Sequence, residues 1–359
     1  MRILVDAKEL SEAVAHVARV LDPDRPGILL DAGEEGLTVS ASGDSQWSRA
    51  VIQGDPIENG RTTVNGLWLD ALARVMPAGE INVETHDTYL QLRGGQASLR
   101  MRVAADDLTP DQPTLPDTIH DVDAAGFEAL CKSVTGAAGA TRDQPVLAAV
   151  NLTSRDSVLT ACATNRYMAA RRTLDTPGLP DGTWLADADW LKRNMRGVTG
   201  IGFTDRMMLI RTDRWTDMIT LVDGTYPDLD RLWTQDGEHG TITVDRQRLL
   251  DAARMLRTVC FDRTPGTIPI GLDEHENMLR ARYLGGGLDG DSMGVRMLDA
   301  DLEGDVHVNL NADYLIAALQ AMDAPQVTFH VNGLHPTLIT QDDAVVDQLI
   351  VPVRGVRES

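Results

Sequence analysis

The stretch SVLTACATNRYMAARR, residues 157–172, lies near the middle of the chain, and the fold prediction starts from it. An apolar run is interrupted by the polar tripeptide Thr-Asn-Arg, and a second run of small apolar residues follows the tyrosine. This pattern predicts a buried strand, a tight turn and a second strand. The turn therefore presents four side chains at an edge of the predicted sheet: Thr164, Arg166, Tyr167 and Met168.

Two further stretches show the same change from strand to exposed turn. LVDGTYPDLDRLW, residues 221–233, passes from an apolar run into Tyr-Pro-Asp. DQLIVPVRG, residues 347–355, is an apolar run interrupted by Pro352. Proline cannot donate a ladder hydrogen bond, so it marks a strand end or an edge strand. We expect all three stretches to end at the surface of a sheet.

Together the segments ATNRYMAA, YPDLDRL and VPVR resemble three motifs of the bacterial sliding clamp, the β subunit of DNA polymerase III. In that family these motifs line one pocket, which receives short peptides from polymerases and from the clamp loader. Chain length, repeat spacing and the terminal motif also fit, so the resemblance covers the whole chain. It implies a non-catalytic subunit with no cofactor.

Composition restricts the class of protein. The chain has 359 residues, of which 43% are hydrophobic, enough for two or three cores. No apolar run approaches the length of a membrane span, and the N-terminus lacks the pattern of a secretory signal. Cys131, Cys162 and Cys260 lie in apolar contexts without paired spacing, which favours a reducing compartment over a disulfide or zinc framework. We expect a cytoplasmic protein, and the resemblance to sliding clamps implies a location at the nucleoid and replication fork.

The formal net charge of -21 would ordinarily argue against a nucleic-acid partner, because phosphate binding depends on basic patches. A ring that encloses DNA needs little affinity, provided that its few positive charges face the hole. The position of the basic residues therefore matters more than their sum.

A pattern of strand, amphipathic helix and short alternating strands recurs along the chain. The predicted helices cover 7–21, 63–76, 123–139, 187–197, 245–259 and 311–322. Second-helix starts near Asn65, Ala188 and Asn311 are spaced by about one ordinary domain. The pattern predicts an α+β fold with three repeated domains, at 1–110, 122–234 and 242–359, joined by linkers at 111–121 and 235–241.

The resemblance implies that these are DNA-clamp domains and that two chains pair head to tail. The expected homodimer is a six-domain ring with helices lining the hole and sheets outside, since a heterologous contact can close into a ring. We expect the interface to join the region Ala97–Val103 to the region Val259–Phe261. The implied partners are double-stranded DNA, encircled without sequence preference, a second copy of the chain, the polymerase III catalytic subunit and a clamp-loader subunit.

Basic residues on the predicted helices and in two turns are the candidates for facing DNA. Ordinary solvated helix charges are the alternative, and the pattern alone does not decide between them. Contacts of this kind would go to phosphates and be largely independent of sequence. The candidate residues are Arg25, Arg74, Lys132, Arg142, Lys192, Arg193, Arg196, Arg246 and Arg254.

A peptide groove needs an apolar floor and a few polar groups that orient the peptide backbone. For single residues such as Leu147 and Leu232, core packing is the simpler interpretation, and the constellation as a whole is more specific. Carried onto this sequence, the family's groove would consist of Leu147, Thr164, Arg166, Tyr167, Met168, Ala169, Pro227, Arg231, Leu232, Asn311, Tyr314, Val351, Pro352, Val353 and Arg354.

The chain departs from the family pattern at two of these positions. Where the family commonly has Arg-Leu, this chain has Met168-Ala169. Loss of the arginine removes a fixed set of donors, and the change from leucine to alanine shortens an apolar wall. We therefore expect a wider, less polar groove with its own peptide preference. A divergent clamp paralogue that binds or sequesters such peptides without acting on DNA is the alternative function.

Motifs for catalysis or metal binding are weak. Gly285, Gly287 and Gly290 match a dinucleotide fingerprint in spacing, but no helix or βαβ pattern surrounds them. The DEHEN turn at 273–277 lacks the helical histidine spacing of a metal site, and a solvated hairpin turn is the simpler interpretation. We predict neither a catalytic site nor a metal site. An enzyme that processes DNA with a metal or nucleotide is the remaining alternative class.

Overall fold

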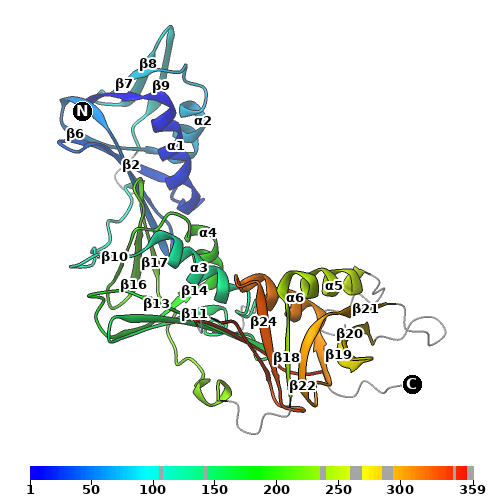
Figure 1. The fold of residues 1–359 in the computed structure, drawn as a ribbon. Coiled ribbons are helices and arrows are strands. Elements are labelled where there is room, and N and C mark those ends of the chain that lie inside the picture. Colours follow the sequence, from blue (N-terminus) through cyan, green and yellow to red (C-terminus); the bar gives the residue numbers. More distant parts are fainter. Residues whose placement is uncertain are drawn as a thin grey trace. The chain divides into compact units, whose positions relative to one another are not determined.

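The computed structural model describes residues 1–104, 108–140, 144–234, 240–258, 269–284, 294–342 and 345–353 (Figure 1). Two of the predicted site residues, Arg142 and Arg354, lie outside the described residues. So do the glycine motif at 285–290 and the predicted interface region Val259–Phe261.

The order of elements repeats three times along the chain: strand, helix, three-strand meander, strand, helix, three-strand meander. The first copy also contains a short 3-10 turn, η1 (Ala18–Val20), and an additional strand, β5 (Gly54–Glu58). Its other elements are β1 (Arg2–Asp6), α1 (Ala7–Val17), β2 (Gly27–Gly33), β3 (Gly36–Ser42), β4 (Gln46–Ile52), β6 (Gly60–Asn65), α2 (Gly66–Ala73), β7 (Glu80–Thr85), β8 (Tyr89–Gly94) and β9 (Ala97–Arg102).

The second copy follows the same order and ends in a 3-10 turn, η3 (Asp230–Leu232). Its elements are β10 (His120–Asp121), α3 (Ala124–Thr135), β11 (Ala149–Arg155), β12 (Val158–Thr164), β13 (Met168–Asp175), β14 (Gly182–Asp187), α4 (Ala188–Asn194), β15 (Gly200–Phe203), β16 (Met207–Arg211) and β17 (Trp215–Thr220).

The third copy again contains an additional strand, β22 (Ala300–Gly304), at the place that β5 takes in the first. Its other elements are β18 (Gly240–Asp245), α5 (Arg246–Thr258), β19 (Pro269–His275), β20 (Met278–Tyr283), β21 (Val295–Leu298), β23 (Val308–Asn311), α6 (Ala312–Ala321), β24 (Gln326–Val331), β25 (Thr337–Thr340) and β26 (Val346–Ile350).

Strands from different copies pair with each other. The eight-stranded sheet has the order β10-β15-β16-β17-β4-β3-β2-β6, and the nine-stranded sheet has the order β14-β11-β12-β13-β26-β25-β24-β18-β22. The two smaller sheets are β5-β1-β7-β8-β9 and β21-β20-β19-β23. In both large sheets the last strand of one copy, β17 or β26, therefore lies antiparallel to the third meander strand of the preceding copy, β4 or β13.

Residue contacts divide the chain into two compact units. The first contains Met1–Ala124 and Gly197–Leu221, and the second contains Ala125–Arg196 and Val222–Ser359. This division runs through the segment predicted as the middle domain, because β15, β16 and β17 group with the first unit. The three-domain boundaries stay a prediction.

Helix positions follow from apolar periodicity and from capping side chains. Leu10, Ala13, Val14 and Val17 form one buried face of α1, as the sequence predicted. The side chain of Asn65 accepts a hydrogen bond from the amide of Trp68 at the start of α2, which confirms its prediction as an N-cap. Asp187 and Asn311 cap α4 and α6 in the same way.

Helix ends and edge strands differ from the prediction. The helix predicted to reach Leu21 ends at Val17 and continues as η1, and α2 ends at Ala73 instead of residue 76. The linker predicted at 111–121 contributes β10, which pairs with β15. Within the described ranges, none of the helices combines the length and the apolar character needed to cross a membrane.

Candidate functional site

An apolar cavity of about 660 Å³ lies in the second unit, beside the turn between β12 and β13. One side is formed by the segment before β11, another by the β12–β13 turn, and a third by the segment that leads into η3. We call this third part, residues 223–233, the wall segment. The lining residues are Gln144, Pro145, Val146, Leu147, Thr164, Arg166, Thr225, Pro227, Leu229 and Leu232.

Local hydrogen bonds fix the β12–β13 turn. The side chain of Asn165 accepts from the amides of Tyr167 and Met168 at 3.0 and 2.9 Å. The Thr164 hydroxyl donates to the Met168 carbonyl at 2.7 Å and accepts from the Arg166 amide at 3.1 Å. Arg166 has a φ of 77°, a left-handed conformation that L-residues rarely adopt. The turn therefore holds an arginine at the cavity at some cost in backbone energy.

Two tyrosines from distant parts of the sequence meet beside this turn. Tyr167 is 60% exposed, and its ring stacks on that of Tyr314, the third residue of α6. Burial raises the pKa of Tyr314, and the neighbouring Tyr167 and Asp313 raise it further. Asn311 is buried and accepts from the amides of Asp313 and Tyr314. Its side-chain Nδ2 is buried and has no hydrogen-bond partner among the described residues.

The C-terminal segment runs past the same turn. The Val351 amide donates to the Tyr167 carbonyl at 2.8 Å, and the Val353 amide donates to the Asn309 carbonyl at 2.8 Å. Pro352 lies between these two residues and has no amide to donate. The described end of the chain is therefore anchored both to the β12–β13 turn and to β23.

The structure divides the predicted groove residues into two groups. Leu147, Thr164, Arg166, Pro227 and Leu232 line the cavity. Tyr167, Tyr314, Asn311 and Val351–Val353 form the adjoining cluster described above, and Arg231 lies in η3 of the wall segment. Sequence reasoning missed Gln144, Pro145, Val146, Thr225 and Leu229. Leu229 lies in the tyrosine-proline motif itself. An apolar side chain between two aspartates was the sequence feature that could have indicated a residue lining the cavity.

Met168 and Ala169 are both 3% exposed and do not line the cavity. Ala169 packs in an apolar cluster with Trp233, Leu338 and Leu349. The expectation that a small residue at 169 widens the groove is therefore wrong at this point, because Trp233 covers the alanine. The residues of the ATNRYMAA motif alone did not predict that Ala169 packs against Trp233.

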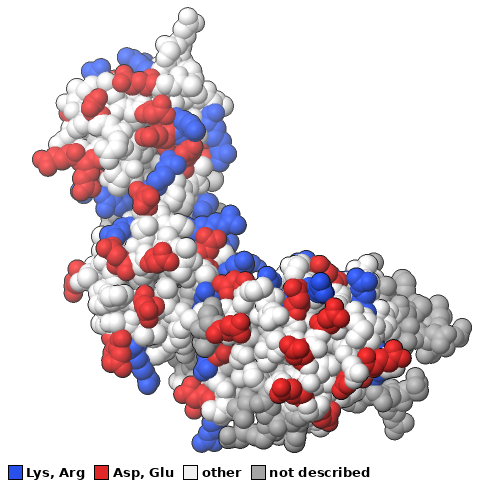
Figure 2. Space-filling model, viewed as in Figure 1, with Lys and Arg blue, Asp and Glu red and all other residues white. Residues whose placement is uncertain are grey.

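Among the described candidates for facing DNA, Lys132, Lys192, Arg193, Arg246 and Arg254 lie on helices as predicted, whereas Arg74 and Arg196 lie just past the ends of α2 and α4. Several of these residues have acidic neighbours. Arg74 contacts Asp70 at 2.9 Å, Arg196 lies 3.8 Å from Glu128, and Arg254 lies 3.8 Å from Asp251. Lys132 and Lys192 are exposed on α3 and α4. On the face shown in Figure 2, basic side chains are interspersed with acidic ones.

Arg246 must be removed from this set. Its guanidinium donates to the carbonyl oxygens of Ala324 at 2.8 Å and Leu319 at 3.1 Å. These oxygens lie at and just after the C-terminal end of α6, where carbonyl groups lack helical partners. Arg246 therefore stabilises the packing of α5 and α6. Arg25 lies in the turn after η1 and borders a small polar cavity of about 220 Å³ with Asp22, Asp44 and Asp111.

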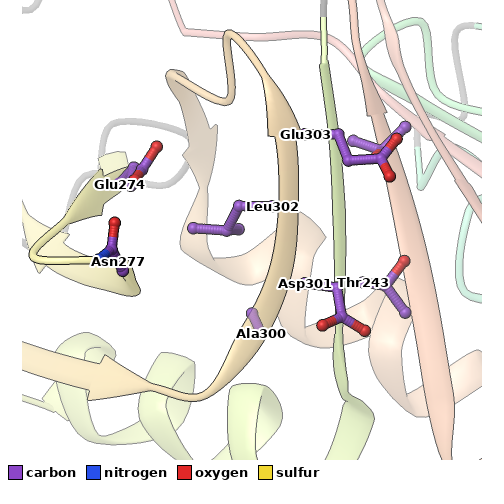
Figure 3. A pocket seen from close by; sticks show the side chains of 8 residues that line it. Thr243, Glu274, Asn277, Ala300, Asp301, Leu302 and Glu303 are labelled. Atoms are coloured by element: carbon purple, nitrogen blue, oxygen red, sulfur yellow. The ribbon is translucent and has the colours of Figure 1, made fainter.

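A third cavity, of about 640 Å³, is lined by carboxylates (Figure 3). Asp301 and Glu303 come from β22, and Glu274 and Asn277 come from the hairpin of β19 and β20 on the opposite side. Three carboxylates around one opening disfavour phosphate by direct charge repulsion. DNA is therefore not expected at this face.

The described residues contain no group of three or more His, Cys, Asp or Glu side chains that could hold a metal ion. Burial raises the pKa of Cys162 to about 12, with a smaller opposing effect of Arg171, and burial also raises the pKa of Cys131. Both thiols are therefore protonated at neutral pH and are poor nucleophiles.

The chain is similar to known clamps over its full length. The beta sliding clamp of Streptomyces coelicolor is 25% identical over 382 residues, an alignment that covers 99% of both chains. The chain belongs to the beta sliding clamp family. The Micrococcus luteus clamp is 28% identical over 74% of this chain and 90% of its own length. The clamp homolog GriR of Streptomyces muensis is 25% identical over 99% of both chains. No protein-family model matches the chain.

Solved structures show the same clamp fold. The polymerase β subunit of Streptococcus pyogenes aligns with a TM-score of 0.89 at 18% identity, over 99% of this chain and 100% of that one. The Bacillus subtilis sliding clamp aligns with a TM-score of 0.87 at 19% identity, over 99% of each chain. The α+β fold and the family resemblance predicted from the sequence are thereby confirmed. Members of the beta sliding clamp family are non-catalytic processivity factors, so this chain is not an enzyme.

Proposed function

We propose that the protein is a DNA sliding clamp that encircles duplex DNA as a head-to-tail homodimer and tethers a polymerase through the cavity beside Tyr167 and Tyr314. The observation that carries the proposal is the cavity itself. It is mainly apolar, it is bordered by Arg166, and two of the motifs by which the chain resembles clamps supply residues to its lining. Such a site suits a short peptide with apolar anchors.

The sheet edges support ring closure. β9 ends one small sheet and β21 ends the other. In the repeated order of elements, β9 corresponds to β17 and β26, whereas β21 corresponds to β4 and β13. Within the chain, β17 pairs with β4 and β26 pairs with β13. A second copy of the chain would therefore supply each open edge with the partner that its counterparts already have, and this would close a ring.

The two pairings within the chain also give the expected register. Thr216 lies opposite Arg49 at one junction, and Asp347 lies opposite Arg171 at the other. The corresponding residues of the open edges are Ser98 and Val295. On this basis the predicted interface region Ala97–Val103 pairs with β21, with Ser98 of one protomer opposite Val295 of its partner.

A cysteine pair tests the ring. Ser98→Cys combined with Val295→Cys is expected to form a disulfide-linked dimer under mild oxidation, because directly opposite strand residues lie within disulfide range. The matched control combines Ser98→Cys with Met297→Cys, which lies two residues out of register. Equal cross-linking in both variants would contradict the register, and a monomer in light scattering at micromolar concentration would contradict the ring.

Retention on DNA tests the function. The cysteine variant, loaded on nicked circular DNA and then cross-linked, is expected to stay bound through gel filtration and to be lost when the circle is cut. Lys132→Ala with Arg193→Ala is expected to weaken retention at low salt, because these exposed helix residues would contact phosphates. Such a clamp would act at the replication fork in the cytoplasm. Dissociation at the same rate from circular and linear DNA would rule out encirclement.

A second candidate is a paralogue that binds clamp-binding peptides without acting on DNA. It is favoured by the net charge of -21 and by the use of Arg246 inside the fold. This candidate predicts normal peptide binding by a protein that is never retained on circular DNA.

A further inference from the structure

The wall segment, residues 223–233, supplies four of the residues that line the cavity: Thr225, Pro227, Leu229 and Leu232. Among the described residues, its backbone hydrogen bonds are local ones, from the Leu232 amide to the Leu229 carbonyl and from the Trp233 amide to the Asp230 carbonyl. Bonds of this kind shape the segment but do not attach it to the sheet. Side-chain packing must therefore determine where this side of the cavity lies.

Trp233 is the most buried side chain at the end of the wall segment, with 8% of its surface exposed. It packs on a row of residues from three adjacent strands of the nine-stranded sheet. Ala169 lies opposite Leu349, and Leu349 lies opposite Leu338, so the three side chains share one face of the sheet. The small alanine is what leaves room on this row for an indole ring.

A second row of the same face covers the indole. The guanidinium carbon of Arg171 lies 4.6 Å from the Trp233 ring centroid. Its Nε and Nη2 both donate to Oδ2 of Asp347, at 2.7 and 2.6 Å. Since Asp347 is the cross-strand neighbour of Arg171, the ion pair holds the guanidinium over the ring. Trp233 is therefore enclosed between the apolar row and a fixed cation.

We propose that Trp233 is a positioning residue for the peptide site: its ring, seated on Ala169 and held under Arg171, fixes the wall that carries Leu229 and Leu232. The inference rests on the proposed peptide-binding function of the cavity. It assigns the specificity of the groove to a pair of residues, Ala169 and Trp233, neither of which lines the cavity. A leucine at 169 would occupy the place of the indole and displace the wall segment.

A double-mutant cycle tests this pairing. The probe is a fluorescein-labelled peptide with the C-terminal sequence of the same organism's polymerase III catalytic subunit, and affinity is measured by anisotropy. Trp233→Ala and Ala169→Leu are each expected to weaken binding about tenfold, whereas the double variant regains most of the affinity, because leucine then fills the space of the ring. Trp233→Phe, which keeps an aromatic ring on the row, is expected to bind within about threefold of the wild type.

Hydrogen exchange of the amides in 226–233 provides a readout without peptide. Both single variants are expected to speed exchange in this segment and leave exchange in α5 unchanged, and the double variant is expected to restore protection. Multiplicative effects of the two substitutions on affinity, or unchanged exchange in Trp233→Ala, would overturn the inference. If the wild-type protein binds no peptide while exchange follows the cycle, the proposed function fails and the role of Trp233 in fixing the wall stands.

Discussion

The rings of Tyr167 and Tyr314 lie with their centroids 6.2 Å apart and their planes 12° from parallel. One ring comes from the turn between β12 and β13, and the other comes from the first turn of α6. The pair therefore joins the second and third copies of the repeated element order at the place where the C-terminal segment passes. Its offset stacking leaves the outer side of Tyr167 exposed and able to contact a ligand.

Removal of one ring should abolish the peptide site without opening the fold. Tyr314→Ala is expected to weaken binding of the polymerase-tail peptide at least about tenfold, because central aromatic residues dominate interfaces of this kind. The native mass in light scattering should remain that of the wild type. Tyr314→Phe, which keeps the ring, is the matched control and should bind normally. Unchanged affinity in Tyr314→Ala would show that the peptide binds elsewhere.

Truncation before Val351 removes the two backbone hydrogen bonds that anchor the end of the chain, to Tyr167 and to Asn309. We expect loss of peptide binding with the dimer retained, since β26 ends at Ile350 and keeps its pairing with β13. Truncation after Val353 is the control for the anchored residues. A monomeric product would show instead that the segment supports the ring.

Arg166→Gly should separate backbone strain from charge. Glycine adopts the φ of 77° without the cost to an L-residue, about 1–2 kcal/mol, although its greater freedom in the unfolded chain offsets about half of this. The free energy of unfolding is therefore expected to rise slightly, by about 0.5–1 kcal/mol, in urea titration. Peptide affinity should fall because the cavity loses its cation. Arg155→Gly, at the end of β11, is a surface control, and equal stabilisation there would contradict the strain argument.

The first unit contains a buried polar cluster that should be sensitive to substitution. His16 Nε2 lies 3.0 Å from both carboxylate oxygens of Asp217, and the Ser48 hydroxyl donates to Asp217 at 2.6 Å. His16→Ala leaves a buried carboxylate with one partner fewer, so we expect a loss of about 2–3 kcal/mol in the free energy of unfolding. His86→Ala, at a more exposed histidine, is the control. If the free energy of unfolding falls less in His16→Ala than in His86→Ala, the cluster does not stabilise the fold.

Asp273 predicts how stability responds to acid. Burial raises the pKa of this carboxyl, but the hydrogen bond and charge of Arg280, with Arg282 and His307, outweigh burial and hold it below its usual value. A depressed folded-state pKa contributes stability that is present above the unfolded value, about 3.9, and is lost as the pH falls through the folded value.

Asp273→Asn should therefore destabilise the protein by about 2 kcal/mol at neutral pH, because two partly buried arginines lose their counter-charge. The difference from the wild type should shrink below about pH 4. Urea titrations over a pH series measure both effects, with Asp299→Asn at an exposed ion pair as the control. A constant difference at all pH values would contradict the depressed pKa.

The sequence predicted what local patterns determine. Apolar periodicity gave the buried face of α1, and residue type gave the caps at Asn65 and Asn311. The strand-turn-strand pattern predicted the turn at Thr164–Met168, two residues of which, Thr164 and Arg166, line the cavity. Even the family resemblance was carried by short motifs, each of them a turn whose geometry depends on its own residues.

What the sequence did not predict depends on contacts between distant segments. β5 was missed because it contains Pro56 and lies at a sheet edge, where apolar alternation is weak. Arg246 was predicted to face DNA because the residues near it in the sequence do not indicate its carbonyl partners, which lie more than 70 positions away. The same is true of Ala169 and Trp233. A small residue in a strand indicates room above it, but only the register of β13 and β26 shows which ring fills that room.

The pairing of β4 with β17 also has a consequence for synthesis on the ribosome. β4 ends at Ile52, but the strand that covers its edge begins only at Trp215, and the whole second copy from α3 to α4 is translated in between. At bacterial elongation rates this edge would wait on the order of ten seconds for its partner. The nascent chain thus leaves the edge of Gln46–Ile52 unpaired throughout that time, and we expect a chaperone to protect this strand until β17 has been made.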